Sequence, residues 1–105
     1  MSKYKNVKCE YDGKKFDSLK EMRHYIYLKQ LEKQGKISNL ICQFKMPFLI
    51  NGKRIFTYIA DFFLLDEKNK PHYLDVKSPI TAKNSTFRLK KKLIEAQYDV
   101  KIEII

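Results

Sequence analysis

The chain begins with two short strand-like runs on either side of a turn signal. Asn6 to Tyr11 and Lys14 to Phe16 flank the dipeptide Asp12-Gly13. Asp-Gly readily adopts the positive φ angles of a type I′ turn. The pattern therefore predicts a short β-hairpin.

A run with helical periodicity follows the hairpin. Asp17-Ser18 offers an N-cap and Gly35 a C-terminal stop, so we predict a helix from Leu19 to Gln34. Its expected buried stripe consists of Leu19, Met22 and Ile26, widened by Tyr25 and Leu28 on the flank that also carries Glu21.

Three strand-like runs rich in Phe, Ile, Leu and Tyr come next: Leu40 to Ile50, Arg54 to Leu65 and His72 to Lys77. Asn51-Gly52 is a strong hairpin signal between the first two runs. The polar stretch Asp66 to Pro71 predicts a further turn before the third.

The remaining chain predicts a basic helix and a closing strand. Asn84 to Gln97 places apolar residues in a helical setting among many lysines, and Val100, Ile102 and Ile104 alternate with polar residues. The element order is hairpin-α-β-β-β-α-β. It predicts an α/β fold with a mixed β-sheet flanked by helices, in a single domain of residues 1–105.

The net charge of the chain indicates the kind of molecule that it binds. Lysine and arginine outnumber aspartate and glutamate by 22 to 12, which gives a net charge of +10 that attracts nucleic acid. Arginines are few, so we expect contacts to the phosphate backbone more than reading of bases. The alternative is that the lysine-rich composition reflects codon bias and solubility.

The cysteines and the hydropathy of the chain bear on metal sites, disulfides and the cellular compartment. Cys9 and Cys42 lie far apart and outside any metal-binding spacing, so neither a disulfide framework nor a zinc site is predicted. No stretch approaches the roughly 20 apolar residues of a membrane span, and the polar start lacks the apolar region of a signal peptide. We therefore expect a cytoplasmic protein.

Asp61 is the first candidate for chemistry, because its near neighbours in the sequence are apolar or small. A carboxylate buried without compensation loses its hydration at high cost. A bound cation would compensate it. So would a lysine or backbone amides, and Asp61 alone does not decide between these.

The third strand-like run strengthens the case for a cation. Asp75 and Lys77 are two residues apart and are expected on one face of that strand. If the strand pairs with that of Asp61, two carboxylates and an ammonium converge, which favours a divalent ion such as Mg²⁺ or Mn²⁺. The alternative is an ordinary salt bridge between Lys77 and an acid.

Glu21 has two readings that can hold together. Ser18-Leu-Lys-Glu21 fits the capping box of a helix N-terminus. Ser18 can instead cap alone, which leaves Glu21 free to turn toward the sheet.

These residues resemble the PD-(D/E)xK nuclease superfamily, and the likeness covers nearly the whole chain after Asp17. It rests on the element order, the helix glutamate, Asp61 in the second strand and Asp75-Val76-Lys77 in the third. Within the superfamily the chain is most similar to small phage enzymes that resolve branched DNA. It is also similar to a phage family with the pattern DG-x-x-FDS-x-x-E, which here spans Asp12 to Glu21. Ala60 stands where the superfamily often has proline.

The resemblance implies a restriction-endonuclease-like core and a role for each site residue. Asp61, Asp75 and the Val76 carbonyl would hold Mg²⁺ or Mn²⁺, and Glu21 would complete or extend the shell. Lys77 would orient the attacking water or neutralise charge on the scissile phosphate. The implied activity is hydrolysis of phosphodiester bonds in DNA, with branched, Holliday-junction-like DNA favoured. A homodimer would supply two sites for paired cuts.

Further residues are candidates for contacts with DNA. Gln43 lies on the first long strand, where related nucleases often carry a polar residue near the metal. The others follow the Asp75-Lys77 strand and could grip phosphates: Ser78, Thr81, Lys83, Arg88, Lys90, Lys91 and Lys92. A merely solvated helix face is the alternative. We interpret His24 and His72 as ordinary surface residues.

Two other functions remain open at this stage. A DNA-binding module that keeps the fold without catalysis would be expected to lack an acid or the lysine, and none of the four is missing. A nuclease of the same fold acting on nicks or flaps is indistinguishable by sequence.

Overall fold

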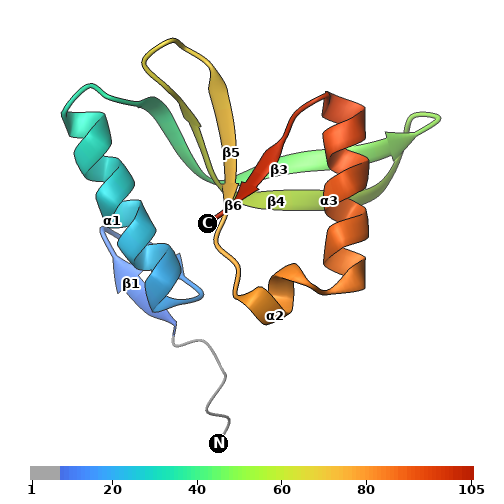
Figure 1. Ribbon diagram of the computed structural model, residues 1–105, viewed down its shortest axis with the longest axis horizontal. Coiled ribbons are helices and arrows are strands. Elements are labelled where there is room, and N and C mark those ends of the chain that lie inside the picture. Colours follow the sequence, from blue (N-terminus) through green and yellow to red (C-terminus); the bar gives the residue numbers. More distant parts are fainter. Residues whose placement is uncertain (1–7) are drawn as a thin grey trace, which may run out of the picture.

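A four-stranded mixed sheet with helices packed against it dominates the computed structural model, which describes residues 8–105 (Figure 1). The strand order is β3-β4-β5-β6, antiparallel except for the parallel pair β5 and β6. This mixed α/β architecture is compatible with a restriction-endonuclease-like core. The elements are β1 (Cys9–Tyr11), β2 (Lys14–Phe16), α1 (Leu19–Lys33), β3 (Ser38–Ile50), β4 (Lys53–Leu65), β5 (Pro71–Asp75), α2 (Pro79–Ala82), α3 (Ser85–Tyr98) and β6 (Ile102–Ile104).

Both predicted hairpin turns are confirmed by their backbone angles. Asp12 and Gly13 have φ angles of 57° and 74°, and Asn51 and Gly52 have 51° and 76°. Positive φ at both central positions is the type I′ requirement. The first predicted strand is confirmed from Cys9 onward, while Asn6 and Val7 lie outside the described residues.

Helix α1 is confirmed, but its buried stripe differs from the predicted one. Ser18 caps the helix, and its most buried residues are Glu21, Tyr25 and Leu28. Leu19 is 43% exposed, so its place in the stripe was wrong. The helix is rotated toward Glu21 because Tyr25 packs against Phe16 of the β1–β2 hairpin, with ring centroids 5.1 Å apart.

The β3–β4 hairpin has an irregular backbone at its centre, and different helices pack on the two sides of that point. Gln43 has a φ of 56°, an uncommon value for a non-glycine residue, and it lies with Asp61 between the pairs Cys42↔Phe62 and Phe44↔Ala60. On one side of this point Phe62 packs with α1 residues, and on the other Ala60 packs with Ile94 of α3. The two helices therefore cover different parts of the sheet (Figure 1).

The third predicted strand ends two residues early, which corrects one expectation. Strand β5 stops at Asp75, so Asp75 and Lys77 do not share a strand face. On the β4 side, the Val76 N–H donates to a carboxylate oxygen of Asp61, 2.8 Å away, in place of a backbone carbonyl, while Ile105 still bonds the backbone of Asp75 and Lys77 on the β6 side. The short helix α2 that follows was not predicted, although Ser78 caps it and Pro79 occupies its first turn.

The second predicted helix and the closing strand are confirmed as α3 and β6, with β6 beginning at Ile102. Asn84, the first residue of the predicted helix, is the N-cap of α3. Between residues 8 and 105, no helix has the length and apolar content needed to cross a membrane.

Candidate active site

The ends of several elements enclose a hollow of about 210 Å³, here called the site hollow. It lies where the start of α1 meets β4, the end of β5 and α2. Three of the four residues singled out from the sequence line it. The lining residues are Asp17, Ser18, Lys20, Glu21, Asp61, Val76, Lys77, Ser78 and Thr81.

Asp61 faces the site hollow from the centre of the sheet. It is 8% exposed, and one oxygen, Oδ2, accepts the Val76 N–H at 2.8 Å. Burial raises its pKa to about 6, with repulsion from Asp75 adding to the rise, while the Val76 N–H and Lys77 oppose it. Asp61 is therefore a carboxylate that is costly to leave ionised and uncompensated.

Glu21 reaches the same hollow from α1 and still belongs to the helix cap. Its backbone N–H donates to Ser18 Oγ at 3.1 Å, and its Oε2 accepts from Gln43 Nε2 at 3.1 Å. Burial, followed by repulsion from Asp61 and Asp17, raises the pKa of Glu21 to about 7. Ser18 therefore caps the helix with its own side chain, while the Glu21 side chain turns toward the sheet.

Asp75 is held differently from the other two acids. It is fully buried and does not line the site hollow. Its Oδ1 accepts the Asp61 N–H at 3.0 Å, and its Oδ2 accepts from the Tyr58 hydroxyl. Burial raises the pKa of Asp75, although the Tyr58 and Asp61 hydrogen bonds favour the ionised form. Each of its oxygens therefore accepts a hydrogen bond from a protein donor.

Lys77 lies at the edge of the site hollow, beyond the end of β5. Its Nζ is 5.3 Å from the centroid of the Phe87 ring of α3, within cation–π range. The positive charge lowers the pKa values of Glu21, Asp61 and Asp75 against the effect of burial. The ion pairs found in residues 8–105 do not include Lys77, so the salt bridge considered as the alternative is not formed.

The donor set fits a divalent cation in part. Glu21 and Asp61 are acidic, repel each other and line one hollow, and carboxylate oxygens suit Mg²⁺ or Mn²⁺. In the described part of the chain, no group of three or more His, Cys, Asp or Glu residues is arranged to hold a metal ion. Asp75 is the residue that does not fit, because it is fully buried, does not line the hollow and already accepts a hydrogen bond at each oxygen.

Four residues of this neighbourhood were missed by sequence reasoning. Asp17 and Lys20 line the site hollow, and Lys20 Nζ donates to the Lys77 carbonyl oxygen at 3.3 Å. Their positions were a usable signal, because Asp17 directly precedes the N-cap and Lys20 is in the first turn of α1, next to Glu21. Tyr58 and Phe87 had no such signal, because their roles depend on which elements pack together.

The predicted contacts to DNA divide into two groups. Ser78 and Thr81 line the site hollow, with their hydroxyl oxygens 3.1 Å apart, and Gln43 touches Glu21. Lys83 is exposed at the end of α2. These polar residues gather around or beside the candidate site.

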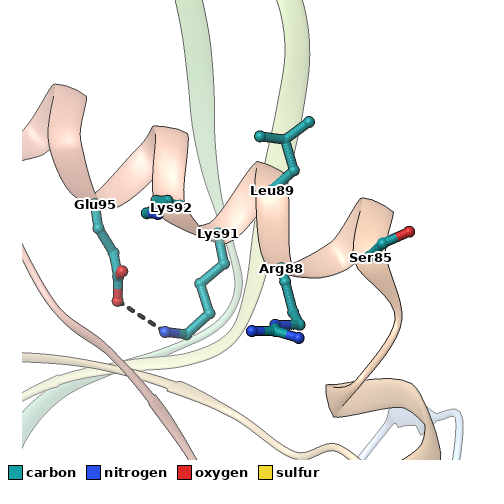
Figure 2. A pocket seen from close by; sticks show the side chains of 6 residues that line it. All are labelled: Ser85, Arg88, Leu89, Lys91, Lys92 and Glu95. Atoms are coloured by element: carbon teal, nitrogen blue, oxygen red, sulfur yellow. Dashed lines mark hydrogen bonds and ion pairs between the residues drawn. The ribbon is translucent and has the colours of Figure 1, made fainter.

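The α3 residues border a second space of about 430 Å³, here called the α3 hollow (Figure 2). Its residues are Ser85, Arg88, Leu89, Lys91, Lys92 and Glu95. Lys91 pairs with Glu95 at 3.0 Å, and Lys90 lies over the Phe56 ring. Lys90 and Lys91 are thus engaged within the protein, which leaves Arg88 and Lys92 as the cations better disposed toward a polyanion.

The interpretation of His72 as an ordinary surface residue was wrong. Its Nε2 lies 2.8 Å from Asp66 Oδ2, and its Nδ1 lies 2.8 Å from Glu103 Oε2. These two hydrogen bonds raise the pKa of His72. The imidazole therefore bridges the β4–β5 turn and strand β6.

Comparison with known families places the chain among relatives but assigns no activity. A family model described as "Protein of unknown function (DUF1064)" matches residues 1–105, so the chain belongs to that family. No curated protein and no solved structure gives a significant match.

Proposed function

We propose that the protein is a metal-dependent DNA endonuclease of the PD-(D/E)xK type. The observation that carries this proposal is the pair Glu21 and Asp61, two buried carboxylates with raised pKa values that line one hollow together with Lys77. Buried acids that repel each other are costly to a fold and are typical of sites that bind a cation or move a proton.

The residues around the hollow have complementary roles in phosphodiester hydrolysis. A bound Mg²⁺ or Mn²⁺ would supply Lewis acidity and a water of lowered pKa. Glu21 and Asp61 would bind the cation, and the ammonium of Lys77 would offset the charge that develops on the phosphate. Ser78 and Thr81 can donate hydrogen bonds to phosphate oxygens from the rim of the same hollow.

The substrate is proposed to be DNA, with branched DNA favoured, encountered in the cytoplasm. A net charge of +10 supports a polyanionic substrate. Arg88 and Lys92 at the α3 hollow are suited to the backbone beside the cut. A homodimer would provide two sites for paired cuts, and nicks or flaps are the other DNA shapes to be compared.

A second candidate is a DNA-binding module without catalysis. The observation that favours it is the occupation of both Asp75 oxygens by protein donors. Such a module would bind DNA with the same basic residues and would not respond to divalent cations.

The decisive experiment offers purified protein linear, nicked, flapped and four-way DNA with Mg²⁺, Mn²⁺ or EDTA. We expect cleavage only with a divalent cation. Asp61→Asn and Lys77→Ala should each lower the rate at least about a hundredfold, since the first removes a carboxylate that would bind the cation and the second removes the ammonium that would offset charge on the phosphate. Glu67→Gln and Lys68→Ala are matched controls in the exposed β4–β5 turn and should leave the rate unchanged.

The outcomes separate the candidates. Binding without cutting under every metal condition supports the non-catalytic module. Folded Asp61 and Lys77 variants that cut as fast as the parent would place the chemistry elsewhere in the molecule.

A further inference from the structure

Asp61 is tied to Asp75 and to Val76 by two hydrogen bonds at the point where β4 and β5 cease to pair. The last Cα partners on this side are Phe62↔Leu74. Beyond them the Asp61 N–H donates to Asp75 Oδ1 at 3.0 Å, and the Val76 N–H donates to Asp61 Oδ2 at 2.8 Å. Two carboxylates therefore take the place of ladder carbonyls between the strands.

Tyr58 is the other hydrogen-bond partner of Asp75. Its hydroxyl donates to Asp75 Oδ2, and its ring lies 6.2 Å from that of Phe87. Tyr58 is 6% exposed, and Asp75 is fully buried. A buried carboxylate needs its oxygens satisfied, and this one already has a hydroxyl and an amide as partners.

Asp75 is fully buried and does not line the site hollow, so a direct contact with a cation there would require its carboxylate to turn away from one of these two donors. Either the Tyr58 hydroxyl or the Asp61 amide would then be left buried without its partner, which is unfavourable. Glu21 and Asp61 can contact a cation in the site hollow without this loss. Both residues line the hollow, and within residues 8–105 Oδ1 of Asp61 accepts no hydrogen bond, while the Glu21 carboxylate accepts from Gln43 and from the Asp17 backbone.

We infer that Asp75 and Tyr58 are positioning residues that fix the backbone and the carboxylate of Asp61, and that Asp75 does not itself contact the cation. The cation half of this inference rests on the proposed function. It differs from the role that the superfamily resemblance implies for Asp75, which is that of a metal ligand.

Calorimetric titration of Mn²⁺ into purified variants tests the cation half. Asp75→Asn keeps an oxygen for the Asp61 N–H and an amide that can donate to the Tyr58 oxygen. Its affinity should stay within about threefold of the parent, whereas Asp75→Ala, which loses the supporting contact, should lose about tenfold. Asp61→Asn should abolish measurable binding, and Glu67→Gln should leave it unchanged. A loss in Asp75→Asn as large as that in Asp61→Asn would make Asp75 a ligand and overturn the inference.

Amide hydrogen exchange measured by NMR tests the positioning half without any metal. The Asp61 amide should exchange at least about ten times faster in Asp75→Ala than in the parent, and Asp75→Asn should restore most of the protection. Tyr58→Phe, which removes only the hydroxyl, should give a smaller acceleration at the same amide. Unchanged exchange at Asp61 in a folded Asp75→Ala protein would overturn the positioning role.

The two measurements distinguish this inference from the proposed function. If the parent binds no Mn²⁺ and cuts no DNA, the proposed function fails together with the cation half. The exchange experiment still decides whether Asp75 fixes Asp61.

Discussion

Burial changes the protonation of two carboxyl groups in the site hollow. Glu21 and Asp61 have pKa values raised to about 7 and about 6, chiefly because both carboxylates are withdrawn from water. At pH values between the ordinary and the raised pKa values, these two carboxyl groups are therefore protonated in the folded chain and ionised in the unfolded chain. A divalent cation would replace those protons.

This protonation predicts how metal-free stability depends on pH. Glu21 has an ordinary pKa of 4.5 and a folded value of about 7, so between these values the native state binds more protons than the unfolded state. The free energy of unfolding should therefore fall as pH rises through this window, with Asp61 acting in the same direction.

Mg²⁺ should reverse that loss. We expect the increase in Tm on adding Mg²⁺ to be larger at about pH 8 than at about pH 5.5, where the ion competes with protons. Thermal melts with Mg²⁺ and with EDTA at the two pH values measure this difference. Glu21→Gln should reduce it, and Glu67→Gln should not. An equal increase at both pH values would argue against a cation at these carboxylates.

At the scale of elements, local signals predicted most of the fold. The Asp-Gly and Asn-Gly turns and the Ser18 cap depend on neighbours in the sequence, and all were confirmed. The early end of β5 was not predictable, because it depends on Asp61 taking the Val76 N–H from fifteen residues away.

The candidate site was predictable to a similar extent. Sequence reasoning identified Glu21, Asp61 and Lys77, and the structure brings all three to one hollow. It did not identify Tyr58 as a partner of Asp75, because a residue three positions before Asp61 is expected on the opposite face of a regular strand. The change in strand packing around Gln43 and Asp61 is a tertiary feature that the local pattern does not contain.

The bridge formed by His72 belongs to the same scale, since it joins the β4–β5 turn to β6. The pKa of His72 is raised by Asp66 and Glu103, so the stabilisation is complete below the ordinary value of 6.5 and is lost as pH rises through the folded value. His72→Gln should therefore lower Tm at about pH 6 and have a smaller effect at about pH 9.

His24→Gln is the matched control for this prediction. The pKa of His24 is lowered by burial, so its contribution runs in the opposite direction with pH. Thermal melts of the three proteins across the pH range make the comparison. A His72→Gln effect that does not shrink with rising pH would show that the bridge acts without its charge.

For the whole molecule, we expect DNA binding to depend more on where the positive charges lie than on the net charge. Several lysines are engaged within the fold, including Lys91 with Glu95 and Lys29 with Glu32. Arg88 and Lys92 remain at the α3 hollow. The useful part of the net charge is therefore expected on this face.

The salt dependence of DNA binding tests that expectation. Replacing Arg88 and Lys92 together by alanine should weaken binding and lower the slope of log Kd against log salt by about 2, the value for two phosphate contacts. Fluorescence anisotropy in EDTA, at increasing KCl, measures the slope without cleavage. Lys33→Ala with Lys36→Ala removes the same charge at the far end of α1 and should change the slope less. Equal effects of the two double variants would indicate attraction by net charge alone.

The contact between Lys77 and Phe87 offers an optical signal. The chain contains no tryptophan, so Phe87→Trp would introduce a single indole beside the ammonium of Lys77, whose distance from the present ring centroid is 5.3 Å. Indole is the ring that best accommodates a cation on its face. Its emission would report any movement of Lys77 toward a phosphate, so occupancy of the site could be followed in real time without labelling either the protein or the DNA.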